Sequence, residues 1–278
     1  MYADIHLHSN YSDGTLSVKQ LVEKAKLNNV SLISICDHHS IRNYKELAIL
    51  CANNSLNYLY GLEINASLEN DGSYVHILGY NPDPMNVILL DLLDYCISIY
   101  DDMSYELIKH MSNDYGNISI NEYINFIFTG KFGGWKAYEY LLTKNIICHL
   151  QDYFNFISLY GINKPDFILA NQVCSILKYA NGVPVLAHPG NTFSPEKLNY
   201  YLDLMKECGI EGIECYYPHH TSNTTQICLE YCETNDLLIT GGSDDHGDFM
   251  IDDKSHFIGM NNFKVNINSL YLGNLNIY

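Results

Sequence analysis

Three polar side chains near the start of the chain, Asp4, His6 and His8, have the types and spacing to bind a metal ion. They alternate with apolar residues, and alternate residues of a β-strand project from the same face. The two imidazoles would lie about 7 Å apart along the strand and could lean toward one cation. A polar loop that carries Asp13 and ends in a glycine follows. This spacing indicates one corner of a metal site, although a His-x-His pair also occurs by chance on exposed strands.

Further histidines and carboxylates stand at or near the ends of later predicted strands. The hydrophobic pattern predicts these strands at residues 31–36, 57–62, 74–80, 183–187, 212–215 and 237–240. The polar groups on or just after them are His38, Glu63, His76, His188, Asp244 and His246. With His6, His8 and Asp13 they make nine groups, which suit two or three divalent cations better than one. Mixed imidazole and carboxylate ligands favour Zn, Mn or Fe over Mg or Ca.

The order of the predicted elements indicates the fold. Strands alternate with amphipathic helices over residues 1–82 and again over 166–278, which predicts an α/β fold of the (β/α) barrel type. In such barrels the active site lies at the carboxyl ends of the strands. Residues 83–165 instead contain several helical segments, and we expect them to form a helical insertion over the active site.

Composition limits the possible partners. The net charge of −17 and the lack of a Lys/Arg cluster argue against a surface for long nucleic acid. Nine cysteines, an odd number set in apolar segments, are expected to be reduced thiols of a cytoplasmic protein. Candidate ligands begin at residue 6, which leaves no room for a signal peptide, and no apolar run is long enough for a membrane helix. Protein partners are not predicted.

The motifs of the chain resemble those of the PHP (polymerase and histidinol phosphatase) metallo-phosphoesterases. They are D-I-H-L-H, S-D-G, C-D-H-H, G-L-E-I, V-H-I-L-G-Y, A-H-P-G, I-E-C-Y-Y-P-x-H and G-S-D-D-H, in the order of that family. The resemblance covers residues 1–80 and 183–248. The helical insertion resembles the branch of small phosphatases that act on nucleotides and short oligonucleotides. The resemblance to the family implies a distorted seven-stranded, TIM-like (β/α) barrel that holds three metal ions.

The resemblance also implies which residues hold each ion. The first metal would be held by His6, His8, Glu63 and Asp244, the second by Glu63, His76 and His188, and the third by Asp13, His38 and His246. The Glu63 carboxylate would bridge the first two. Asp4 and Asp37 would orient ligating histidines as hydrogen-bond acceptors.

Such a centre predicts a hydrolase. A bridged metal pair can lower the pKa of a shared water and direct the hydroxide at phosphorus, while further cations bind the phosphate oxygens. We expect hydrolysis of a phosphoester bond in a small phosphorylated metabolite or nucleotide. The alternatives are a cyclic-phosphate diesterase, an amidohydrolase-like metallohydrolase acting on a substrate without phosphate, and a metal-loaded binding protein without turnover. A third metal position favours phosphoester chemistry.

Four residues are predicted to contact the substrate. His220 could protonate the leaving oxygen, although a plain surface histidine fits its position nearly as well. Arg42, the single arginine, could grip a phosphate in a bidentate fork or be an exposed helix charge. Lys131 and Lys136 could meet the rest of an anionic substrate.

The insertion departs from the pattern of its branch at one turn. A Gly-Arg-Pro-His-like sequence is usual there, whereas this chain has Gly133-Gly134-Trp135-Lys136. We therefore expect a substrate other than a bisphosphorylated nucleotide. Trp135 is expected to pack the insertion onto the barrel, with stacking on a substrate ring as the alternative.

Overall fold

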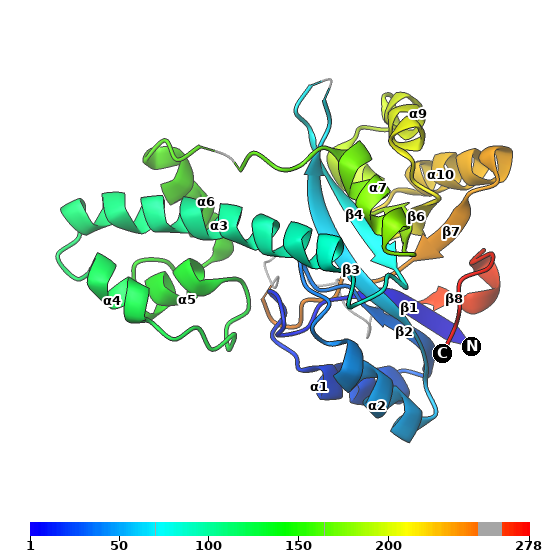
Figure 1. The fold of residues 1–278 in the computed structure, drawn as a ribbon, viewed down its shortest axis with the longest axis horizontal. Helices are drawn as coiled ribbons and strands as arrows, with labels where there is room; N and C mark the ends of the chain where they lie inside the picture. The colour runs from blue at the N-terminus through cyan, green and yellow to red at the C-terminus, as the bar shows by residue number, and fades with distance from the viewer. Residues whose placement is uncertain (70, 164, 250–262) are drawn as a thin grey trace.

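The core of the fold is one sheet of eight strands that curls into a nearly closed barrel (Figure 1). The computed structural model describes residues 1–69, 71–163, 165–249 and 263–278. The strands are β1 (Tyr2–Leu7), β2 (Val30–Ile35), β3 (Asn57–Ser67), β4 (Tyr74–Tyr80), β5 (Val183–Leu186), β6 (Gly212–Tyr216), β7 (Leu238–Gly241) and β8 (Val265–Asn266). They lie in the order β7-β6-β5-β4-β3-β2-β1-β8. The predicted barrel is confirmed, with one short strand, β8, that was not predicted.

Strand β4 departs from the predicted pattern of parallel strands. It runs antiparallel to both neighbours, β3 and β5, whereas the pairs β1–β2, β2–β3, β5–β6 and β6–β7 are parallel. Strand β3 also continues to Ser67, past Glu63, where the sequence predicted its end. The two strands form a hairpin, so His76 near the start of β4 lies at the end of the barrel where the parallel strands finish. The reversed direction therefore brings His76 to the predicted site.

Strand β1 closes the barrel through the loop that follows β7. The N–H of Asp244 donates to the carbonyl of His6 at 2.9 Å, and the N–H of His8 donates to the carbonyl of Asp245 at 3.0 Å. At its start β1 instead pairs with β8. These few hydrogen bonds stand in place of a full β-ladder between β1 and β7, which is one way in which the barrel is distorted. The closure also places His6 of β1, and His8 directly after it, beside the loop that carries Asp244.

Helices cover the outside of the barrel on two flanks. They are α1 (Val18–Leu27), α2 (Tyr44–Asn54), α7 (Ala170–Tyr179), α9 (Leu198–Cys208) and α10 (Ser222–Asn235), while the short helix α8 (Pro189–Thr192) directly follows His188. Figure 1 shows α7, α9 and α10 on one flank and α1 and α2 on the other. Ser17 caps α1 by accepting the N–H of Gln20. Among the helices of the described residues, none has the length and apolar character that crossing a membrane requires.

The helices between β4 and β5 build a lobe beside the barrel. They are α3 (Val87–Asp114), α4 (Ile120–Asn125), α5 (Lys136–Thr143) and α6 (Leu150–Leu159). Helix α3 passes from the barrel into the lobe (Figure 1). Its first half buries Leu89 and Cys96 in the barrel core, whereas its second half buries Leu107 and Met111 with Tyr153 of the lobe. The two cores therefore share one continuous helix.

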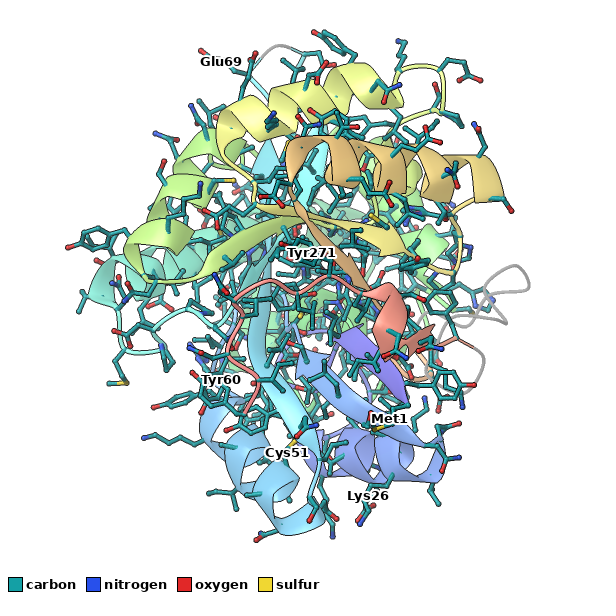
Figure 2. The ribbon with its side chains drawn as sticks, turned by 90° about the vertical axis from the view of Figure 1, so that its right-hand side faces the viewer. Met1, Lys26, Cys51, Tyr60, Glu69 and Tyr271 are labelled. Carbon is teal, nitrogen blue, oxygen red and sulfur yellow. The ribbon has the colours of Figure 1, made fainter. Side chains whose placement is uncertain are left out.

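The C-terminal segment closes the end of the barrel away from the lobe. Figure 2 looks at this end and shows the segment, with Tyr271 labelled, crossing in front of the strands. The segment includes the short 3-10 helix η1 (Ile267–Ser269), and its apolar side chains pack on a cluster that includes Ile5 and Tyr80. Tyr271 also exchanges two backbone hydrogen bonds with Ile239. Because the C-terminal segment packs over this end, the carboxyl ends of the parallel strands lie at the opposite end of the barrel.

Gly242, next to β7, provides a test of the barrel closure. A Cβ atom at this position would lie 2.4 Å from the Cβ of His6 and 2.5 Å from its backbone N. Gly242→Ala should therefore lower the free energy of unfolding by about 1–3 kcal/mol through overpacking. Gly116→Ala is the control, because no atom lies within 4 Å of its Cβ position. Urea unfolding of both metal-free variants measures the difference, and equal stabilities would contradict this account of the closure.

Candidate metal centre

The nine predicted ligands lie together at one end of the barrel, in overlapping groups. His6 comes from β1, Glu63 from β3 and His76 from β4, His8 directly follows β1, and the others stand on loops that follow strands. Four groups of side chains have ligand atoms within 4.8 Å of one another. They are His6–His8–Glu63–Asp244 (the first group), His8–Asp13–His38–His246 (the third group), His38–Glu63–His76 and His6–His188–Glu214. The structure thus brings all nine predicted residues to one place.

The first group encloses a point between β1, β3 and the loop after β7. The Nε2 atoms of His6 and His8 lie 3.2 Å apart. His8 Nε2 is 3.0 Å from Asp244 Oδ1 and 3.2 Å from Glu63 Oε2, and His6 Nε2 is 3.4 and 3.3 Å from the same oxygens. Two imidazole nitrogens and two carboxylate oxygens therefore converge on one point.

Glu63 contacts a second group, formed by His76 and His188, through its other oxygen. Its Oε1 atom lies 3.0 Å from His76 Nδ1 and 3.1 Å from His188 Nε2. Its Oε2 atom faces the first group and also lies 3.4 Å from His38 Nε2. One carboxylate thus contacts two sets of imidazoles from opposite sides, which is the arrangement of a bridging ligand.

The third group surrounds the Asp13 carboxylate. His246 Nε2 lies 3.2 Å from Asp13 Oδ2, and His38 Nε2 lies 3.9 Å from the same oxygen. The Nδ1 atom of His8 is 3.5 Å from Asp13 Oδ1. His8 therefore faces the first group with one nitrogen and the third with the other.

The donor atoms fit divalent metal ions. Ligand atoms about 2.0–2.2 Å from an ion in tetrahedral geometry lie about 3.3–3.6 Å from one another, close to the separations in the first group. His8 Nδ1 and Asp244 Oδ1 are buried without a hydrogen-bond partner, as is Nδ1 of His188. Buried polar atoms normally have partners, so unpartnered atoms on several of the clustered side chains indicate cation positions.

The charges of the cluster depend strongly on one another. Burial raises the pKa of a carboxyl group, but the imidazoles of His38, His6 and His76 outweigh it and hold the pKa of Glu63 well below its usual range. Burial likewise lowers the pKa of an imidazole, yet Asp244 and Glu63 raise the pKa of His8 to about 10. Without metal, protons therefore balance the carboxylates, and metal binding must displace them.

Glu214 on β6 is a site residue that the sequence analysis missed. Its Oε1 atom accepts from His6 Nδ1 at 3.0 Å, and its Oε2 atom accepts the backbone N–H of His188 at 2.9 Å. With both oxygens occupied and no exposure to solvent, Glu214 orients two ligands and leaves His6 Nε2 facing the first group. Tyr217, which also was not predicted, donates its hydroxyl hydrogen to Asp244 Oδ2 at 3.2 Å.

The predicted roles of Asp4 and Asp37 need correction. Neither carboxylate has a hydrogen bond to a histidine among those found in the described residues. Asp4 Oδ1 instead accepts the N–H of Ser243, just before Asp244. Asp37 accepts the N–H and hydroxyl of Ser9, the hydroxyl of Ser12 and the amide of Asn43. Through these bonds the two carboxylates hold segments next to the ligand candidates Asp244, His8 and Asp13.

His220 is held away from the role of proton donor. Its Nε2 atom accepts the N–H of Gly190 at 3.1 Å, and its Nδ1 atom donates to the carbonyl of Cys215 at 3.0 Å. Burial also lowers its pKa. The one N–H of this neutral imidazole is donated to a backbone carbonyl and is not directed at a leaving group, so the structure favours a structural role and does not support the predicted one.

The three predicted cationic contacts do not point into the cluster. Arg42 is largely exposed, and its guanidinium lies 3.8 Å from Asp94 of α3. Lys136 donates to the carbonyl of Ile124 at 3.0 Å, over the ring of Tyr123. Lys131 lies over Phe132. Long side chains take their direction from local partners, and here those partners belong to the lobe or the barrel rim.

Backbone strain marks the same region. His39, His188 and Asp244 have positive φ angles of 51°, 25° and 55°, in a region that residues other than glycine seldom adopt. Such conformations persist only where the surrounding structure enforces them, and they concentrate at functional sites. Here they lie beside the ligand groups.

A comparison with known families identifies the chain. The PHP domain matches residues 4–161, which include six of the nine clustered ligands. The chain belongs to the PHP family. The predicted family is confirmed, and the bounds of the match include the helices of the lobe as well as the first half of the barrel.

Relatives cover almost the whole PHP chain. A phosphoribosyl 1,2-cyclic phosphate 1,2-diphosphodiesterase of Eggerthella lenta is 27% identical over 267 residues, which are 90% of this chain and 95% of the relative. A 5'-3' exoribonuclease of Haemophilus influenzae is 24% identical, over 87% of this chain and 89% of its own. A solved structure from Bifidobacterium adolescentis, assigned as a metal-dependent phosphoesterase, has a TM-score of 0.74 and 24% identity. It covers 91% of this chain and 93% of its own.

Glu214 provides a test of how the ligands are oriented. Glu214→Gln keeps the shape but turns one acceptor into a donor facing an N–H group. We expect metal affinity to fall by about 10–100-fold and the free energy of unfolding by about 1–3 kcal/mol. Glu211→Gln, an exposed carboxylate paired with Lys178, is the control and should change stability by less than about 0.5 kcal/mol. Calorimetric titration with Mn²⁺ measures the metal affinity, and urea unfolding measures the stability. Equal affinities in the two variants would refute the orienting role.

Proposed function

We propose that this PHP-family chain is a metal-dependent phosphoesterase that hydrolyses a small phosphorylated molecule at the centre built around Glu63. The observation that carries the proposal is the sharing of ligands. Glu63 contacts two groups of imidazoles, and His8 contacts two groups through its two nitrogens. Ligands shared in this way suit two or three ions held close together, and such ions can bind a phosphate on several oxygens.

The metals, when bound, would supply an activated water and positive charge for the phosphate oxygens. The ligand set of imidazoles and carboxylates supports Zn, Mn or Fe. The chain's own residues keep the geometry. Glu63 would hold the first two ions together, Glu214 holds His6 and His188, and Tyr217 holds Asp244. Orientation of this kind lets a substrate bind with little rearrangement.

The distribution of cationic side chains supports a substrate with one reacting phosphate group. Among the described residues, Lys24 pairs with Asp245, and Arg42 and Lys136 have partners away from the cluster. A second phosphate on the substrate would therefore not meet Lys24, Arg42 or Lys136 where these side chains lie. This favours a small monoester or a cyclic phosphodiester over a nucleoside bisphosphate.

The relatives support a cyclic phosphodiester as the first of these substrates. The Eggerthella lenta relative, which matches nearly end to end, is named for a cyclic phosphate of a phosphoribosyl compound. The Haemophilus influenzae relative is named as an exoribonuclease, so RNA is the competing substrate. The net charge of −17 makes binding of a long polyanion unfavourable away from the metals. We therefore place long nucleic acid last.

A cytoplasmic location is part of the same proposal. All nine cysteines are free, and seven are buried as small apolar side chains. Free thiols in this number are typical of proteins kept in a reducing compartment.

The test is a substrate panel on protein stripped of metal and reloaded with Mn²⁺, Zn²⁺ or Fe²⁺. The panel holds a sugar 1,2-cyclic phosphate, a sugar monophosphate, a nucleoside 3',5'-bisphosphate and a single-stranded RNA. We expect kcat/KM to be highest on the cyclic phosphate or the monoester and at least about tenfold lower on the other two, a difference of about 1.4 kcal/mol. Glu63→Gln should stay folded but lose its metal. Its turnover should fall at least about 100-fold, which corresponds to about 2.7 kcal/mol in the activation barrier.

Three results would count against the proposal. Turnover that persists in a chelator would exclude metal-dependent hydrolysis. Full activity of Glu63→Gln with an unchanged metal content would exclude the bridging role. RNA as the best substrate would leave the enzyme class standing but overturn the preference for small molecules.

A further inference from the structure

A turn of the helical lobe rests directly on the loop that carries Asp13. The N–H of Gly134 donates to the carbonyl of Asp13 at 2.8 Å. Gly133 and Gly134 have φ angles of +69° and +68°, a conformation that side chains rarely allow. Two consecutive glycines thus let the backbone of the lobe approach the backbone of a metal-ligand candidate.

The approach leaves no room for a side chain at Gly133. A Cβ atom there would lie 2.6 Å from the carbonyl oxygen of Asp13 and 2.5 Å from the Cβ of Phe249. At Gly134 it would lie 2.9 Å from Cδ1 of Tyr138. The colliding atom of Asp13 belongs to the main chain, so relief requires a shift of the loop and not a change of rotamer.

The lobe also holds the neighbourhood of His246, through Phe249. The Phe249 ring is buried in the core of the lobe, with its centroid 5.4 Å from that of Tyr138 and 6.3 Å from that of Trp135. On its other side the centroid lies 6.3 Å from the His246 ring. Trp135 therefore packs, as expected from the sequence. The lobe thus contacts the chain near both Asp13 and His246.

The turn itself is anchored by a buried carboxylate. Glu139 of α5 accepts the N–H and the hydroxyl of Thr129 and the N–H of Gly130. It is 2% exposed, and its three hydrogen bonds connect the start of the 129–134 loop to a helix of the lobe. Gly133 N–H in turn donates to the carbonyl of Gly130 at 3.1 Å. A continuous set of contacts runs from α5 to Asp13.

We propose that the Gly133–Gly134 turn is a positioning element for the metal position formed by Asp13, His38 and His246. By fixing the main chain of Asp13, and through Phe249 that of the His246 loop, the lobe determines whether an ion binds there. This inference rests on the proposed metal centre. The lobe then contributes to ion binding at that centre, in addition to any effect that the lobe has on substrate access.

Gly133→Ala is the decisive variant, and Gly161→Ala is its matched control. Gly161 also has a positive φ, +61°, but no atom lies within 4 Å of its Cβ position. The control therefore carries the backbone cost of alanine without the collision. Mn²⁺ bound per chain is measured by equilibrium dialysis and elemental analysis, with kcat/KM and the urea midpoint of the metal-free proteins. Glu139→Gln, which weakens the anchor without adding atoms, is the second variant and carries the test alone if Gly133→Ala fails to fold.

Gly133→Ala should bind about one ion fewer per chain than Gly161→Ala at the same free Mn²⁺, and its kcat/KM should fall at least tenfold. Raising Mn²⁺ should restore part of that activity. In an Asp13→Asn background the same substitution should change the metal content no further, because the ligand on which it acts is already lost.

A metal content of Gly133→Ala or Glu139→Gln equal to that of the control would overturn the inference, as would lost activity with all ions retained. Wild-type protein that binds no Mn²⁺, Zn²⁺ or Fe²⁺ would instead refute the proposed function itself.

Discussion

The carboxylate of Glu63 lies inside the barrel with almost no exposure to solvent, and a buried negative charge is stable only when opposite charges or hydrogen bonds surround it. The cluster meets this requirement by placing imidazoles on both oxygens. This constraint explains the distorted barrel. An antiparallel β4 brings His76 to Glu63, and the irregular contact of β1 with the loop after β7 brings Asp244 to His6 and His8. A regular parallel barrel would not place these side chains together in this way.

A second set of residues keeps the ligands in place without facing the centre. Glu214 binds His6 and the backbone of His188, and Asp37 gathers the loop after β1. These contacts use short side chains and main-chain atoms, which leave little freedom to the ligands. Preorganisation of this kind lowers the cost of metal binding and of substrate positioning, because fewer groups must be ordered when the ion or the phosphate arrives.

The ligands could be predicted from the sequence because strand periodicity and loop position are local properties. His6 and His8 alternate with apolar residues, His188 directly follows an apolar run, and His38 and Asp244 come shortly after one. The orienting contacts could not be predicted, since Glu214 meets His6 across 208 residues and only the folded barrel brings them together. The sequence did not reveal that β4 runs antiparallel to β3, because the short connection between the two strands does not indicate the direction in which the chain returns. Lys136 and Arg42 were misjudged because flexible side chains follow their nearest acceptors.

The central claim is that Glu63 joins two metal positions in one cluster. Crystals of the wild-type protein grown with Mn²⁺ and measured at the manganese absorption edge test it directly, because anomalous scattering locates each ion independently of the protein geometry. The account predicts peaks on both sides of the Glu63 carboxylate, one toward His6, His8 and Asp244 and one toward His76 and His188. A single peak, or peaks that leave the Glu63 carboxylate without a metal contact, would contradict it.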